Sequence, residues 1–126
     1  MIDIERLSPL AHRIVLYGEI TYDDVAAFVA FAKARDAAGE GGNVLFDLVA
    51  MAGIPPLSAF TLELVNIVPI MRWVWRLDRI AIISDEAWLR AASRLESMAL
   101  PGVTYAVYDA DEAEAARAWV LGEGAA

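Results

Sequence analysis

Hydrophobic and polar positions divide the chain into short strand-like runs separated by longer helical stretches. Residues 79–83 form a nearly continuous apolar run, followed by Ser84 and Asp85. Such a run is typical of a strand buried on both faces of a sheet, and the Ser-Asp pair supplies side-chain oxygens that cap a following helix. Further strands are predicted at residues 2–7, 13–17, 43–48 and 103–108. The pattern places residues 79–84 at the centre of a sheet.

Helical spacing of apolar residues predicts four helices between and after these strands. Thr21 and Asp109 are the expected caps of the first and last helix, and each is followed three residues later by an acid, Asp24 or Glu112. The order β-β-α-β-α-β-α-β-α begins with a hairpin and continues with repeated strand–helix units. It predicts an α/β fold with a single mixed, mostly parallel sheet flanked by helices, in one domain over residues 1–126.

The second predicted helix, residues 57–75, is apolar on opposite sides. Phe60, Leu64 and Met71 fall on one face, and Ile70 falls on the other. A helix that is apolar nearly all round must be buried or must meet another molecule. We therefore expect a homo-oligomer, most simply a symmetric homodimer that buries the surplus surface.

The long apolar run in the same region could also indicate a transmembrane segment. Glu63 is the one charged residue between Asp47 and Arg72, but glycine and three prolines interrupt the apolar run. A loop followed by a helix fits this pattern better than a transmembrane segment of about 20 apolar residues. Pro69 removes a backbone donor, so we expect a kink near Val65 or a break before Pro69.

Composition excludes several classes of function. The chain is 59% hydrophobic and carries a formal net charge of −8, which argues against nucleic-acid binding through phosphate neutralisation. It has no cysteine and a single histidine, His12, so disulfides, thiolate catalysis and paired-histidine zinc sites are excluded. We expect His12 to lie at the surface or at the end of the hairpin. Acidic residues interrupt the apolar start of the chain, so we expect a cytoplasmic protein.

The order of the motifs resembles the SpoIIAA-like family, which has the STAS-type fold and is related to CRAL-TRIO lipid-exchange domains. The segments that carry the resemblance are residues 18–24, residues 46–48 with Gly53, residues 79–85 with Trp88, and residues 109–119. The resemblance implies a small mixed sheet flanked by helices and a non-enzymatic role. Anti-sigma-factor antagonists of this fold carry a phosphorylatable serine in an Asp-x-Ser-x-Gly motif after the third strand. Here that place holds Asp47-Leu48-Val49-Ala50-Met51, and the nearest hydroxyl is Ser58.

No set of residues indicates an enzyme, a metal site or a cofactor. Asp23 and Asp24 are adjacent on a helix and therefore do not face each other, and acids in a first turn are favoured by the helix dipole. The acids near Asp109 lack the spacing of a calcium loop. Glu63 or Asp47 acting as a base is the competing enzymatic hypothesis, and solvent exposure of Glu63 is its simpler alternative.

Arginines beside the second helix are the main candidate for binding. Arginine guanidinium groups take phosphates or carboxylates with a fork of donors, while apolar helix residues suit a lipid-like tail. The predicted ligand-binding residues are Phe60, Leu64, Met71, Arg72, Trp73, Arg76 and Arg79. The alternative is that these arginines form structural salt bridges with nearby acids. The sequence thus predicts a binding module for an apolar ligand with an anionic head group; the alternative is a protein-interaction domain of the anti-sigma-antagonist type that lacks the serine.

Overall fold

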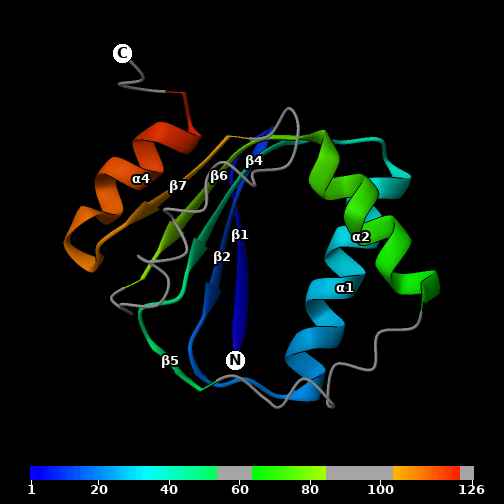
Figure 1. The fold of residues 1–126 in the computed structure, drawn as a ribbon, viewed down its shortest axis with the longest axis horizontal. Coiled ribbons are helices and arrows are strands. Elements are labelled where there is room, and N and C mark those ends of the chain that lie inside the picture. Colours follow the sequence, from blue (N-terminus) through cyan, green and yellow to red (C-terminus); the bar gives the residue numbers. More distant parts are fainter. Residues whose placement is uncertain (54–63, 85–103, 123–126) are drawn as a thin grey trace.

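A five-stranded mixed sheet forms the centre of the computed structural model, which describes residues 1–53, 64–84 and 104–122 (Figure 1). Its strands are β1 (Ile2–Ser8), β2 (Ala11–Leu16), β4 (Gly42–Asp47), β6 (Leu77–Ile83) and β7 (Thr104–Tyr108), in the order β1-β2-β4-β6-β7. The pair β1 and β2 is antiparallel, and all the other neighbours are parallel. This arrangement confirms the predicted α/β class and the mixed, mostly parallel sheet.

Helices cover both faces of the sheet. Figure 1 shows α1 (Tyr22–Ala37) and α2 (Leu64–Arg76) side by side on one face, and α4 (Ala113–Val120) on the other. A short 3-10 turn, η3 (Ala110–Glu112), precedes α4. In the described residues no helix is long and apolar enough to cross a membrane.

Successive side chains of the central strands pack alternately into two separate hydrophobic clusters. Val44 and Ile80, paired across β4 and β6, belong to the cluster under α1 and α2. Their neighbours Leu45 and Ala81 belong to the cluster under α4. Because a strand points successive side chains to opposite faces, a strand covered on both faces must be apolar at nearly every position. This explains the continuous apolar run at residues 79–83.

Both predicted helix caps have the expected hydrogen bonds. The Thr21 backbone N–H donates to Oδ2 of Asp24 at 2.8 Å, and the Asp24 backbone N–H donates to Oγ1 of Thr21 at 3.3 Å. At the turn η3, which leads into the last helix, the Asp109 backbone N–H donates to Oε1 of Glu112 at 2.9 Å. These bonds satisfy donors that the first turn of a helix leaves without partners.

Other local predictions need correction. Helix α2 continues through Pro69, so the predicted break before Pro69 is wrong, while the alternative of a kink near Val65 stays a prediction. The packing of Ile70 and Val74 on the core offsets the lost donor. The segment after β4, predicted to be irregular, includes the strand β5 (Met51–Gly53), which pairs in parallel with β3 (Gly18–Glu19). The predicted helix around Trp88 lies outside the described residues, as does the start of the predicted helix 57–75.

Candidate functional site

The exposed side of α2 combines apolar and basic side chains. Val68 is 48% exposed and Trp75 is 57% exposed. Arg72 is also exposed, and Met71 is half-buried. Met71 and Arg72 each lie three or four positions from Val68 and from Trp75, so the four residues occupy one side of the helix, which we call the outer face of α2. Ile70 and Val74, by contrast, pack against the core cluster on the opposite side.

One carboxylate holds two arginines beside this face. The Asp36 side chain, in the last turn of α1, is only 9% exposed. Its Oδ1 accepts a hydrogen bond from Nη1 of Arg76 at 2.6 Å, and its Oδ2 lies 3.1 Å from Nη2 of Arg72. Nη1 of Arg76 also donates to the Asp36 backbone carbonyl at 2.9 Å. Among the described residues, two positive groups thus share one negative group, which leaves a local surplus of positive charge and fixes the direction of both arginines.

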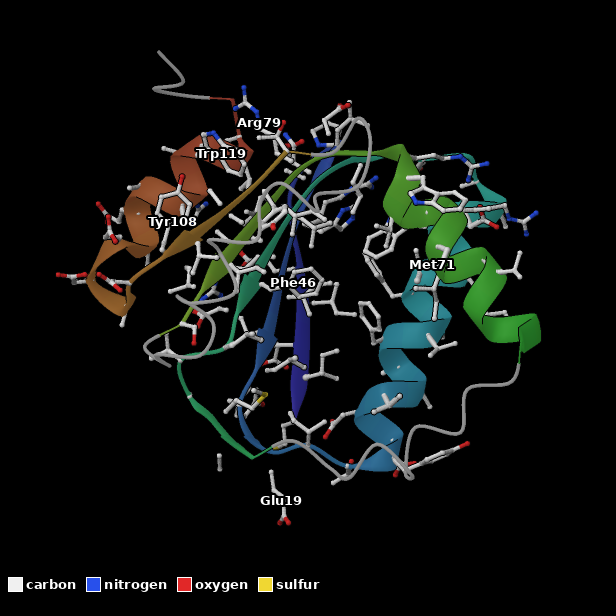
Figure 2. All side chains as sticks on the ribbon, viewed as in Figure 1. Glu19, Phe46, Met71, Arg79, Tyr108 and Trp119 are labelled. Carbon is white, nitrogen blue, oxygen red and sulfur yellow. The ribbon has the colours of Figure 1, made fainter. Side chains whose placement is uncertain are left out.

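Arg79 belongs to a different place in the molecule. Its Nη1 donates to the backbone carbonyl of Trp119 at 2.7 Å, and its guanidinium carbon lies 5.2 Å from the centre of the Trp119 ring. Asn43, its partner across β4 and β6, donates to the carbonyl of Val120 at 2.6 Å. Figure 2 shows Arg79 beside Trp119, away from Met71. Both side chains therefore hold the carboxyl end of α4, where the exposed carbonyls favour donors and cations.

The structure thus brings together only part of the predicted ligand-binding set. Trp73 is 1% exposed and lies in the core, with its ring 6.1 Å from that of Phe28 and 5.6 Å from that of Phe31. Phe60 lies outside the described residues, and so does the side chain of Leu64. Met71, Arg72 and Arg76 remain together on α2.

The sequence analysis did not identify Asp36 as the partner of Arg72 and Arg76. The sequence indicates acids close to the arginines as their alternative partners, whereas Asp36 lies in another helix, 40 residues before Arg76. Nothing local marks it, because an aspartate in the last turn of a helix is unfavourable for the helix dipole and would ordinarily face solvent. Only the packing of α1 against α2 pairs these groups.

His12 lies at the start of β2, at the end of the hairpin, but it is buried rather than on the surface. Its ring stands edge-on to Phe31, with 5.1 Å between the ring centres. Burial lowers its pKa, the charges of Arg35 and Arg6 lower it further, and Glu40 opposes them. His12 is therefore packed inside the domain against Phe31 and has a structural role.

The acids after β7 form a small cluster at the surface. Single carboxylate oxygens of Asp109, Asp111 and Glu112 lie within 4.8 Å of one another. Glu112 already accepts the backbone N–H of Asp109. Exposed acids at the start of a helix are favoured by the helix dipole, so the cluster is explained by its position.

The segment after β4 is held by backbone and side-chain contacts. Oδ1 of Asp47 accepts the Val49 N–H at 3.2 Å, and its Oδ2 accepts a hydrogen bond from Nη2 of Arg13 at 3.3 Å. The Leu48 N–H donates to the carbonyl of Ile83 at 2.9 Å. No serine, threonine or tyrosine occurs from residue 47 to residue 53. This segment therefore has an ordered shape but no hydroxyl group that could be phosphorylated.

The comparisons with known proteins agree with this architecture. The SpoIIAA-like family profile matches residues 12–121. The chain belongs to the SpoIIAA-like family. No curated protein matches it in sequence.

Solved structures share the fold at low identity. The phosphorylated form of SpoIIAA, a Bacillus cell-fate determinant, is 16% identical with a TM-score of 0.58, over 91% of this chain and 96% of that one. The unphosphorylated form, an anti-sigma factor antagonist, is 17% identical with a TM-score of 0.58, over 91% and 94%. An uncharacterised Shewanella loihica protein with a SpoIIAA-like fold is 18% identical with a TM-score of 0.64, over 95% and 92%. These likenesses establish the fold.

Proposed function

We propose that this SpoIIAA-like domain is a non-enzymatic interaction module that binds a partner protein on the outer face of α2. The observation that carries the proposal is the exposure of Trp75 and Val68 on a helix whose opposite side is packed into the core. Exposed aromatic groups beside arginine are enriched at the centres of protein interfaces. SpoIIAA, which shares the fold, is described as an anti-sigma factor antagonist, and this supports a regulatory role through binding of a partner protein. Such a role would here operate without a serine in residues 47–53, the segment directly after β4.

Four acids in the described part of the chain bind structural partners, which supports a non-enzymatic function; Glu63, a predicted candidate for a base, lies outside that part. Asp24 and Glu112 cap helices, Asp36 holds two arginines, and Asp47 binds Arg13 and the Val49 N–H. A general base needs a free lone pair directed at a substrate. Each of these carboxylates is instead turned to a structural partner.

An apolar ligand with an anionic head group is the second candidate. Arg72 and Arg76, next to Met71, support it because their guanidinium groups point in a fixed direction and retain exposed surface. A small-molecule site, however, is usually concave and encloses most of its ligand. The outward-facing Trp75 and Val68 suit a partner's surface better than an enclosed tail.

A matched pair of variants tests where the partner binds. Trp75→Ala removes the aromatic group from the outer face, and Tyr22→Ala removes an aromatic group that is 70% exposed at the start of α1. We expect native mass spectrometry of domain isolated from its own cells to show a bound protein, which Trp75→Ala loses and Tyr22→Ala retains. A bound lipid or acid lost with Arg72→Gln would favour the second candidate. A partner retained equally by both alanine variants would contradict the assignment to α2.

Self-association stays a prediction of the sequence. A symmetric homodimer through the outer face of α2 would bury Trp75 and Val68 of both copies. Sedimentation velocity over a range of concentrations checks it: a dimer that Trp75→Ala dissociates supports the prediction, and a monomer at every concentration contradicts it.

A further inference from the structure

We infer that the partner seated on the outer face of α2 is an α-helix of another protein that carries acidic side chains beside its apolar row. This inference rests on the proposed function and adds the shape and charge of the partner. Three observations lead to it: the spacing of the exposed apolar residues, the position of Arg72, and the pairing with Asp36.

The spacing on α2 suits a helical partner. Val68, Met71 and Trp75 are separated by three and then four residues, the interval of the apolar positions in a heptad repeat. Over these residues the row extends about 10 Å at 1.5 Å per residue. In the sequence, Leu64 continues the interval by four residues towards the start of α2. A row of this kind accepts apolar side chains that another helix presents at the same interval.

Arg72 gives the surface its charge preference. It follows Met71 directly and therefore flanks the apolar row, at the place where charged residues of paired helices choose their partners. Its side chain is 56% exposed although Nη2 lies 3.1 Å from Asp36. An arginine has five N–H donors, so donors remain for a carboxylate on an incoming helix. Because Asp36 already fixes the guanidinium, less conformational entropy is lost when that carboxylate binds.

The same charge disfavours a second copy of the chain on this face. In a symmetric antiparallel pairing through the row, Val68 of one copy would meet Trp75 of the other. Residue 72 lies near the middle of the interval from 68 to 75, so Arg72 would lie beside its own counterpart. Like charges in such positions oppose association, whereas an acidic helix replaces the repulsion with attraction. The net charge of −8 is largely screened beyond about 8 Å at physiological ionic strength, so the local arginine dominates.

A displayed peptide library provides the test. Its peptides are helical, of about 18 residues or roughly five turns, with a fixed apolar row and with glutamate, glutamine or lysine allowed at the flanking positions. They are selected on the wild-type domain and then measured on Trp75→Ala, Arg72→Gln and, as a matched control, Arg117→Gln on α4, whose arginine is also exposed. Far-UV circular dichroism checks that each variant is folded.

We expect glutamate to be enriched beside the apolar row, and replacing it with glutamine to weaken binding about five-fold. Trp75→Ala should abolish binding, Arg72→Gln should remove the preference for glutamate, and Arg117→Gln should change neither. Binding that needs Trp75 but shows no charge preference overturns the inference and leaves the proposed function standing. Binding unaffected by Trp75→Ala, or no selected peptide at all, counts against both. A dimer that competes with the peptides would identify a second copy as the occupant and overturn the acidic-helix inference.

Discussion

Replacing Trp73 with alanine should destabilise the domain strongly, whereas the same change at Trp75, two residues later in α2, should not. Trp73 is 1% exposed and Trp75 is 57% exposed. The pair compares identical substitutions in one helix, so differences in helix propensity cancel. What remains is the difference between a side chain inside the core and one on the surface.

The size of the effect follows from the area that Trp73 buries. A tryptophan side chain buries roughly 150–250 Å², which at about 25 cal/mol/Å² corresponds to about 4–6 kcal/mol. Buried tryptophans replaced with alanine lose about 3–5 kcal/mol. The edge-on contacts of Trp73 with Phe28 and Phe31 are lost as well. We therefore expect Trp73→Ala to lower the free energy of unfolding by about 4 kcal/mol. Trp75 is 57% exposed and hides less than half of its area, so Trp75→Ala should lower it by no more than about 2 kcal/mol.

Urea unfolding followed by far-UV circular dichroism measures both values without relying on tryptophan fluorescence, which the substitutions themselves change. For an m-value of about 2 kcal/mol/M, the midpoint for Trp73→Ala should fall by about 2 M. If that variant does not fold, Trp73→Phe should still show a loss of about 1–2 kcal/mol. Equal losses at the two positions, or a larger loss at Trp75, would refute the placement of Trp73 in the core and of Trp75 on the surface.

Three further predictions follow from polar contacts. Asp36→Asn weakens the hold on two partly exposed arginines, so it should lower the free energy of unfolding by about 1 kcal/mol and the Tm by roughly 3–6 °C; an unchanged Tm would contradict this. The pKa of His12 is lowered below its ordinary value of 6.5, so the native state binds fewer protons than the unfolded chain. Stability should therefore fall as the pH drops from about 6.5 towards the native pKa. His12→Phe should remove that part of the pH dependence in urea midpoints between about pH 7.5 and 5, and an equal dependence in both proteins would exclude His12 as its source. Arg79→Met removes the hydrogen bond to the Trp119 carbonyl, so the amides of α4 should exchange hydrogen faster while those of α1 do not; equal protection of α4 in both proteins would show that the contact contributes nothing.

Much of the fold could be predicted because it depends on local patterns. The apolar run at residues 79–83 indicated a strand covered on both faces, and Ile80 and Ala81 do face different clusters. The caps at Thr21 and Asp109 depend on residues three positions away, so sequence spacing alone predicts them. The order of elements then indicated a mixed sheet, since a hairpin is antiparallel and strands joined through helices are parallel.

The candidate site depended on contacts between distant parts of the chain. The sequence showed that the second helix is apolar on opposite sides, but the tertiary structure decided that Ile70 packs inwards and Val68 faces outwards. It also decided that Asp36, which is distant in sequence, pairs with Arg72 and Arg76. The reason is physical: spacing fixes which residues share a helix face, whereas the burial of that face and the partners of its charges depend on the elements that pack against it.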